Sequence, residues 1–280
     1  MHKIVNKERL NPEMTMIEVE APLVSRKIKP GQFIVLRLHE RGERIPLTFY
    51  KKDEEKETVS MIFQKVGKST HELDSYEIGD EILDVVGPMG RPAEIKKYGT
   101  VVCIGGGVGT PEIFPVAKAL GKAGNQVIVV SGFRTKDLVI CEDELDNECA
   151  DELYITTDDG SYGRKGFTSH VLEELIENRK IDLVHAVGPP IMMKVIADIT
   201  REHGIHTKVS LNSIMLDATG MCGSCRVEID GEMKLACVDG PEFDAHKVNF
   251  KELMARITMF QEQEEKALDR WKEKHGGCCE

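Results

Sequence analysis

The sequence predicts an α/β domain combined with an all-β domain, followed by a small cysteine-rich segment. Three observations support this division. Residues 1–97 contain short β-rich runs, residues from Thr100 onward alternate strands with helices, and residues 211–245 are rich in glycine and cysteine. A chain of 280 residues has room for two modest domains and a small appendage.

The sequence of the first part predicts an antiparallel β-barrel. Its runs TMIEVEAP (15–22), GQFIVLRLHE (31–40), TVSMIFQKVG (58–67) and GDEILDVVGP (79–88) are separated by proline, glycine and charged residues. None of these runs has a convincing helical period. Several short strands without helices are typical of a small barrel.

The sequence of the second part predicts a parallel sheet whose strands are connected by helices. TVVCIGGG (100–107), NQVIVVSGF (125–133), ELYITTDDG (152–160) and DLVHAVGP (182–189) are strand-like, and EIFPVAKALGKAG (112–124) is helical. Such alternation predicts βαβ units. A charged helix over residues 249–274 is expected to close the chain.

A glycine turn joins the first of these strands to the helix. Glycines let the backbone approach a phosphate, and a helix N-terminus offers free N–H groups, so Gly105–Gly109 predicts a dinucleotide pyrophosphate site. The turn departs from a strict G-x-G-x-x-G, and no acidic residue closes the next strand. A tight glycine turn in any α/β domain therefore remains an alternative.

Charge and hydropathy exclude several classes of partner. The net charge of −11 argues against nucleic acid and against an anionic membrane surface. No apolar stretch approaches the roughly 20 residues of a membrane-spanning helix. The N-terminal segment lacks the apolar core of a signal peptide, so we expect a cytoplasmic protein. In that setting eight cysteines favour metal ligation over disulfides.

Three cysteines and one aspartate form a metal-site pattern. Asp217, Cys222, Cys225 and Cys237 are spaced D-x4-C-x2-C-x11-C. Plant-type [2Fe–2S] sites have C-x4-C-x2-C followed by a distant cysteine, so the pattern is that of a ferredoxin loop with aspartate in the first position. It predicts a [2Fe–2S] cluster with Asp217 as a ligand.

Other interpretations of these residues remain open. Asp217 could cap its own turn while Cys278 or Cys279 supplies the fourth ligand. The site could instead bind zinc, which is usually held by cysteine and histidine. The cysteines could also be inert.

A barrel, a glycine-rich βαβ domain and a ferredoxin-like cysteine segment, in this order, resemble the electron-transfer subunits of the ferredoxin–NADP reductase superfamily. The stretch RIPLTFY resembles the R-x-P-x-[ST] flavin motif of that family, although by itself it would be an ordinary strand end. The resemblance implies that Arg44 approaches the flavin pyrophosphate. It implies an isoalloxazine site lined by Ile45, Pro46, Leu47 and Thr48.

A second segment, IFQKVGKST, resembles the strand and glycine loop that hold the rest of the flavin. The resemblance implies that Ile62, Phe63 and Gln64 lie near the adenosine side. Gly67, Ser69 and Thr70 are implied to lie near phosphate, where hydroxyl and amide groups donate hydrogen bonds.

The nucleotide domain also resembles the superfamily at GFRTKDL, TTDDGSYGRKGF and AVGPPIMMKVI. The family usually has a cysteine where this chain has Val187. The residues that the resemblance assigns to the nicotinamide nucleotide are Gly105, Gly106, Gly107, Val108, Gly109, Thr110, Gly188 and Pro189.

Asp158 and Asp159 favour NAD(H) over NADP(H). In NADP-specific relatives this strand end carries hydroxyl and basic residues. Two carboxylates repel a 2′-phosphate, and either can accept a hydrogen bond from a ribose 2′-hydroxyl. Arg164 and Lys165 follow closely and weaken the argument. Both aspartates could also simply start a turn with Gly160.

The resemblance thus implies four parts: a flavin-binding β-barrel (1–97), an NAD-binding α/β domain (98–210), a [2Fe–2S] domain (211–245) and a C-terminal helix and tail (246–280). It implies FAD, NAD(H) and a [2Fe–2S] cluster as cofactors, which carry the chemistry without catalytic acid–base residues. Hydride would be exchanged with NAD(H) at FAD, and single electrons would pass through the cluster to a larger flavin and iron–sulfur partner subunit.

Two families within the superfamily fit this description. One is the small subunit of NADH-dependent reduced ferredoxin:NADP oxidoreductase, an electron-bifurcating heterodimer that serves ferredoxin indirectly. The other is the electron-transfer subunit of NAD-dependent dihydroorotate dehydrogenase. Aspartate at 217 and the C-terminal helix, which could pack on a partner, favour the first. A non-catalytic zinc-binding module is an alternative of another class.

Overall fold

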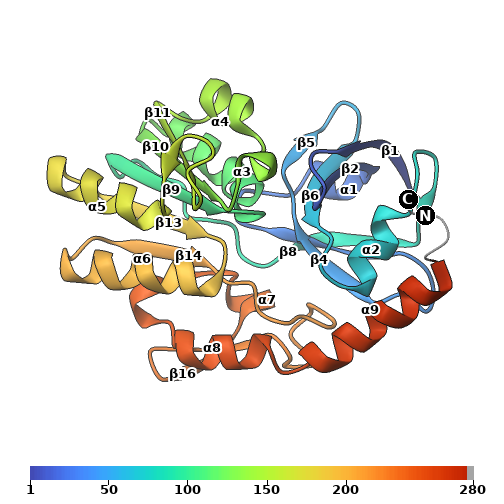
Figure 1. Cartoon of the computed structure of the whole chain (residues 1–280). Helices are drawn as coiled ribbons and strands as arrows, with labels where there is room; N and C mark the ends of the chain where they lie inside the picture. Colours follow the sequence, from blue (N-terminus) through green and yellow to red (C-terminus); the bar gives the residue numbers. More distant parts are fainter. Residues whose placement is uncertain (276–280) are drawn as a thin grey trace.

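The computed structural model describes residues 1–275 (Figure 1). Cys278 and Cys279, the alternative ligands considered above, lie outside the described residues. The N-terminal part consists of two antiparallel sheets, in the orders β5-β6-β2-β1-β7 and β4-β3-β8. Their strands are β1 (His2–Arg9), β2 (Met14–Glu20), β3 (Phe33–Arg37), β4 (Arg44–Thr48), β5 (Lys51–Asp53), β6 (Thr58–Gln64), β7 (Glu81–Ile82) and β8 (Asp84–Met89). The predicted barrel architecture is confirmed.

Two short helices interrupt the barrel, and the sequence analysis did not predict them. They are α1 (Pro22–Ser25) and α2 (Lys68–Asp74). The fully buried Leu73 anchors α2 to the barrel core. Thr70 closes its first turn, since its Oγ1 accepts the N–H groups of Val66 (3.0 Å) and Gly67 (3.1 Å). Two turns are too few to show a helical period in the sequence.

The second part is a parallel sheet covered by helices on both faces. Its order is β12-β11-β10-β9-β13-β14-β17, and only β17 runs antiparallel to its neighbour. The parallel strands are β9 (Thr100–Gly106), β10 (Gln126–Phe133), β11 (Glu152–Thr157), β12 (Arg164–Lys165), β13 (Leu183–Val187) and β14 (Thr207–Ser210). The strand order reverses between β9 and β13, and such a reversal opens a crevice at the carboxyl ends of the strands.

The helices of this domain lie in two layers (Figure 1). One layer contains α3 (Gly109–Lys122), η1 (Lys136–Leu138) and α4 (Glu142–Glu148), and the other contains α5 (Thr168–Asn178) and α6 (Pro190–Glu202). Buried side chains of α3 pack with barrel residues such as Met14 and Tyr50 in one hydrophobic cluster. The ring centroids of Tyr50 and Phe114 are 4.8 Å apart, so the barrel and the nucleotide domain share a core.

The cysteine-rich segment is bound to both other parts. It contains the hairpin β15 (Arg226–Ile229) and β16 (Glu232–Leu235), the short helix α7 (Ala236–Asp239), and β17 (Glu242–Asp244), which is followed by η2 (Ala245–Lys247). Strand β17 pairs with β14 and so extends the sheet of the nucleotide domain. Cys225 and Cys237 belong to the same buried cluster as Phe33 of the barrel.

The C-terminal region forms two helices, whereas the sequence predicted one. Helix α8 (Phe250–Ile257) ends at Thr258, and α9 (Gln261–His275) begins after a turn. Phe250 and Leu253 are buried and anchor α8, while α9 has no buried residue. Helix α9 lies along α2 of this same chain (Figure 1), and the Trp271 and His71 rings are 5.8 Å apart.

None of the helices in residues 1–275 is both long enough and apolar enough to cross a lipid bilayer.

Candidate functional site

A cavity of about 890 Å³ lies between the barrel and the carboxyl ends of the parallel strands. Gly106, Phe133, Thr156 and Val187 bring the ends of β9, β10, β11 and β13 to it, and Gln64 lines it from the barrel. The other lining residues are Glu13, Met14, Gly107, Val108, Gly109, Glu112, Gly132, Arg134, Leu138, Asp158, Phe167, Thr168, Ser169, Gly188, Pro189, Pro190, Ile191, Met192, Val195, Ser210 and Asn212. The cavity thus occupies the predicted crevice.

The glycine turn forms one wall of this cavity. Gly107 has φ +55°, which favours glycine, and nothing lies within 4 Å of the position of a Cβ there. Its N–H donates to the carbonyl oxygen of Gly132 (2.8 Å), which ties the turn to β10. At Gly109 a Cβ would lie 2.2 Å from the carbonyl oxygen of Val187, so only glycine lets α3 begin this close to β13.

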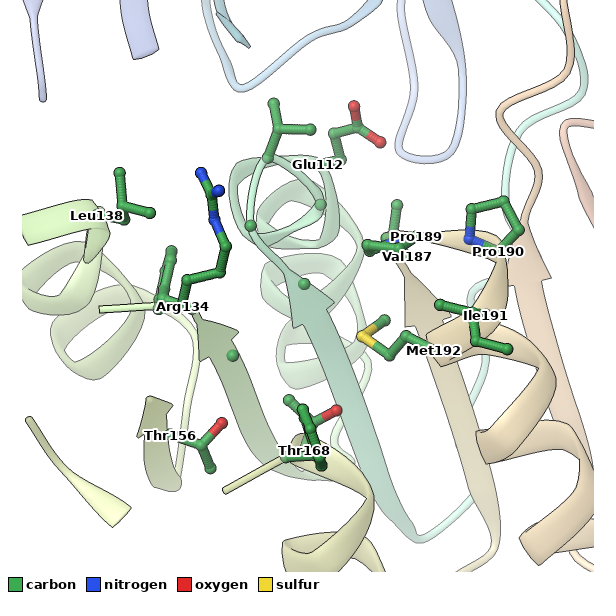
Figure 2. A pocket seen from close by; sticks show the side chains of 18 of the residues that line it. Glu112, Arg134, Leu138, Thr156, Thr168, Val187, Pro189, Pro190, Ile191 and Met192 are labelled. Carbon is green, nitrogen blue, oxygen red and sulfur yellow. The ribbon is translucent and has the colours of Figure 1, made fainter. Parts of the chain in front are cut away.

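Unpartnered polar atoms support a ligand in the cavity. Thr156 Oγ1 is buried and finds no hydrogen-bond partner among the described residues, and Figure 2 shows this side chain at the floor of the pocket. Thr110 Oγ1 beside the glycine turn is also buried and unpartnered within residues 1–275. Buried hydroxyls normally have partners. Open glycine backbone, a helix N-terminus and the Thr156 hydroxyl together fit a dinucleotide.

Four charged side chains line the cavity, and three of them are carboxylates. Glu13, Glu112 and Asp158 are acidic, and Arg134 is the one cationic lining residue among the described side chains. Figure 2 shows Arg134 and Glu112 both extending toward the barrel side of the pocket. This charge balance disfavours a ligand with an extra phosphate group.

Burial alters the ionisation of two of these carboxyl groups. Glu112 is partly exposed and lines the cavity, and desolvation of its carboxyl group by the surrounding protein raises its pKa to about 7. Burial also raises the pKa of Asp158, and the neighbouring Asp159 adds to the shift. Asp159 itself does not line the cavity. Its Oδ1 accepts hydrogen bonds from the N–H (2.9 Å) and hydroxyl (2.6 Å) of Ser161.

The residues of the first flavin segment lie on β4. Arg44, at the start of the strand, is exposed, whereas Ile45 is buried in the barrel core. Pro46, Leu47 and Thr48 are partly exposed and thus accessible to a flavin ring. The strand pairs with β3 throughout its length.

The second flavin segment differs from the expected strand and loop. Phe63 is 1% exposed and faces the barrel core, so only its backbone could reach a cofactor. Ser69 and Thr70 lie in the first turn of α2 rather than in a loop. The hydroxyl of Ser69 is hydrogen-bonded to the Glu43 carboxylate. Gly67 precedes the helix as its N-cap residue.

The predicted cluster ligands lie in one loop and the adjoining hairpin. The Sγ atoms of Cys225 and Cys237 are 3.2 Å apart and buried, while Cys222 is exposed. The carboxylate of Asp217 accepts the N–H groups of Thr219 (2.8 Å) and Cys222 (2.9 Å), so it caps its own turn. Three thiols and a carboxylate are a suitable donor set for a [2Fe–2S] cluster.

These four side chains are not already grouped around one point. Within residues 1–275, no three His, Cys, Asp or Glu side chains stand close enough together to hold a metal ion. The assignment of Asp217 as a ligand therefore stays a prediction.

The cavity unites only some of the predicted nucleotide-site residues. Gly106–Gly109, Asp158, Gly188 and Pro189 line it, whereas Gly105 and Thr110 lie beside it. Sequence reasoning missed Glu13, Glu112, Arg134 and Thr156. Arg134 follows a predicted strand within GFRTKDL, so its position could have indicated a role. Glu13 carries no such signal.

The cysteine-rich segment matches a known family. Residues 212–249 match the model for the iron–sulfur cluster binding domain of dihydroorotate dehydrogenase B. A homologue of the electron transfer subunit of dihydroorotate dehydrogenase B (NAD(+)) from Thermotoga maritima is 47% identical over 271 residues, which cover 97% of this chain and 95% of the relative. The chain belongs to this family of electron transfer subunits. A probable member from Methanopyrus kandleri is 37% identical over 77% of this chain and 79% of its own length.

Solved structures agree with membership of this family. The structure of an NADH-dependent reduced ferredoxin–NADP oxidoreductase, described as giving insight into flavin-based electron bifurcation, superposes with a TM-score of 0.92. It is 45% identical and covers 97% of this chain and 98% of its own. Phthalate dioxygenase reductase (17% identity, TM-score 0.62, 82% of this chain and 86% of its own) shares the fold alone.

The family assignment confirms several predictions. The chain is an oxidoreductase electron-transfer subunit with the predicted fold class, and FAD, NAD(H) and a [2Fe–2S] cluster are its cofactors. The zinc-binding module is not supported, because the cysteine segment matches an iron–sulfur domain.

Proposed function

We propose that this chain is the small subunit of an NADH-dependent ferredoxin:NADP oxidoreductase that takes part in electron bifurcation. The 45% identical ferredoxin–NADP oxidoreductase structure supports this assignment over the alternative. The cavity supports its NAD(H) part, because it is bounded by the glycine turn on one side and by Gln64 of the second flavin segment on the other. The nicotinamide end of a bound nucleotide can therefore face the barrel.

The nucleotide is bound by residues of the parallel-sheet domain. Gly105–Thr110 hold the pyrophosphate at the N-terminus of α3, where free N–H groups and the helix dipole favour an anion. Asp158 accepts a hydrogen bond from a ribose 2′-hydroxyl, and Gly188 and Pro189 line the nicotinamide end. Phe133 and Met14, buried between the domains, exclude water from the inner wall.

The flavin is held by the barrel. Arg44 at the start of β4 supplies a charge-assisted hydrogen bond to the flavin phosphate. Pro46–Thr48 present a partly exposed strand to the ring, with Ile62–Gln64 and Gly67–Thr70 at the rest of the cofactor. A bound flavin supplies hydride exchange with a nicotinamide and single-electron exchange with an iron–sulfur cluster.

The cluster segment packs against β3, the strand that pairs with the flavin strand β4. Phe33 on β3 pairs with Thr48 on β4, and Phe33 shares a buried cluster with Cys225 and Cys237. The N–H of Arg91, just beyond β8, donates to the carbonyl oxygen of Gly240 (2.6 Å) after α7. These contacts hold two of the proposed ligands, Cys225 and Cys237, against the barrel. The other two, Asp217 and Cys222, lie in the loop before β15. In this proposal residues 1–97, 98–210 and 211–245 act as the flavin, NAD and cluster domains.

The proposal is tested by purifying the full chain with its cofactors and assaying reduction of an artificial acceptor. We expect flavin and iron–sulfur absorbance, and a higher kcat/KM with NADH than with NADPH. Equal use of the two nucleotides would contradict the assignment to NAD(H), and missing iron–sulfur bands would contradict the cluster.

A second candidate, the electron-transfer subunit of dihydroorotate dehydrogenase, is favoured by the match over residues 212–249. Purification of the tagged chain from its native cells separates the two. We expect a larger flavin and iron–sulfur subunit that reacts with NADP(H) and ferredoxin. Recovery of a dihydroorotate-oxidising subunit instead would favour the second candidate.

A further inference from the structure

A turn of the flavin barrel reaches across to the nucleotide domain at the mouth of the cavity. Residues 10–13 join β1 to β2, and the side chain of Asn11 makes the turn rigid, because its Oδ1 accepts the N–H groups of Glu13 (2.9 Å) and Met14 (2.8 Å). Asn11 Nδ2 also donates to the carbonyl oxygen of Leu138 (3.3 Å) in the nucleotide domain. Met14, 2% exposed, packs against that domain.

The carboxylate of Glu13 is held by two partners from different domains. Its Oε1 accepts a hydrogen bond from Arg134 Nη2 (2.5 Å), and its Oε2 accepts one from Gln64 Nε2 (2.7 Å). All three residues line the cavity. A carboxylate of the barrel is therefore held against the guanidinium of Arg134 in the nucleotide pocket.

Arg134 is the positively charged side chain that lines the cavity, and a ligand can reach it. Its side chain is 63% exposed, against 34% for Glu13, so a bound phosphate could reach it. A guanidinium has five N–H donors, and Glu13 occupies only part of them. A phosphate that approaches Arg134 must compete with the Glu13 carboxylate, and the negative charge of that carboxylate lowers the affinity of Arg134 for the phosphate. Without Glu13, Arg134 would be an unopposed phosphate-binding group.

We propose that Glu13 is a specificity-determining residue that acts through Arg134: it offsets the charge of the guanidinium and thereby weakens the binding of dinucleotides with a 2′-phosphate. The inference rests on the proposed function, because it requires that the cavity binds a dinucleotide. The charge of Glu13 comes from the flavin barrel, whereas that of Asp158 belongs to the nucleotide domain itself. The Asp158 carboxylate repels a 2′-phosphate directly, whereas the Glu13 carboxylate offsets the charge of Arg134, the group that would attract the phosphate.

Binding of two small probes tests the proposal on the full-length, FAD-loaded protein. The probes are 2′,5′-ADP and 5′-ADP, which differ in whether a 2′-phosphate is present, and calorimetry measures Kd without any turnover. We expect Glu13→Gln to tighten 2′,5′-ADP binding about 5- to 10-fold, the effect of removing one nearby charge, and to change 5′-ADP binding less than twofold. The gain should shrink as the salt concentration rises.

Two further variants show whether Arg134 carries the effect. Arg134→Ala should weaken 2′,5′-ADP binding, and Glu13→Gln in the Arg134→Ala background should give no gain. Glu77→Gln is the matched control, because Glu77 pairs with Lys7 (2.9 Å) on the barrel and does not line the cavity. It should leave both affinities unchanged.

The outcomes separate this inference from the proposed function. Equal tightening of both probes by Glu13→Gln would mean that Arg134 binds the pyrophosphate instead, and would overturn the inference. The inference would also be overturned if Glu13→Gln changed neither affinity. If the unaltered protein bound neither 5′-ADP nor NAD⁺, the proposed function and this inference would fail together.

Discussion

Replacement of Gly109 by alanine tests a close backbone approach on which the nucleotide site depends. The added Cβ would lie 2.2 Å from the carbonyl oxygen of Val187 and 2.9 Å from the backbone nitrogen of Gly188. Both contacts are with backbone atoms of the neighbouring strand and turn, which cannot rotate away. The N-terminus of α3 must therefore move away from β13, and overpacking of this kind typically costs about 1–3 kcal/mol.

Gly121 in the same helix provides the matched control. A Cβ at Gly121 would find its nearest neighbour at 3.7 Å, an ordinary van der Waals distance. Gly121→Ala should therefore stabilise α3 by about 0.5–1 kcal/mol, the usual gain from glycine to alanine in a helix. Because both variants add the same methyl group to one helix, the difference between them isolates the steric cost at Gly109.

Thermal unfolding followed by circular dichroism, at equal flavin occupancy, measures this difference. At about 2–4 °C per kcal/mol, Gly109→Ala should unfold roughly 2–12 °C below Gly121→Ala. Its affinity for NAD⁺ should also fall, because the N–H groups at the start of α3 move. If Gly109→Ala is as stable as Gly121→Ala and binds NAD⁺ normally, then α3 does not approach β13 as the structure describes.

Three further predictions concern the other parts of the site. Arg44→Ala should weaken flavin retention, because a charge-assisted hydrogen bond to the flavin phosphate is lost, and should leave the iron–sulfur absorbance intact. An unchanged flavin affinity would refute the assignment of RIPLT as the flavin motif. Glu112, with a pKa of about 7, is neutral at lower pH and anionic above, so NAD⁺ affinity should fall as pH rises through 7. In Glu112→Gln that dependence should flatten between about pH 6 and 8, and a persisting dependence would exclude this carboxyl group. Asp217→Cys should keep a [2Fe–2S] cluster with shifted EPR g-values, whereas Asp217→Ala should lose it; an unaltered cluster in Asp217→Ala would exclude aspartate as a ligand.

Local patterns in the sequence determined the fold class and predicted a nucleotide site at the glycine turn. Short strands without helices separate the barrel from the second domain, where strands alternate with helices, because parallel strands need a crossover connection and antiparallel strands do not. The glycine turn 105–109 was predictable because it requires only neighbouring residues: a buried strand, a turn and a helix start. The spacing of Cys222 and Cys225 could be recognised as a cluster motif for the same reason, because it depends only on residues close in the sequence.

Tertiary structure decided what depends on distant segments or on burial. Glu13 and Arg134 are far apart in the sequence, and nothing local in either predicts that they pair across two domains. The raised pKa of Glu112 comes from the protein packed around it, which the sequence does not reveal. Helix α2 is stabilised because Leu73 is buried in the barrel, and not by a helical repeat of apolar residues in its sequence. Helix α9 contacts α2 because the folded chain brings the C-terminal region back to the barrel. Contacts between remote residues become visible only once the chain is folded, because folding alone brings their side chains within hydrogen-bonding or packing distance.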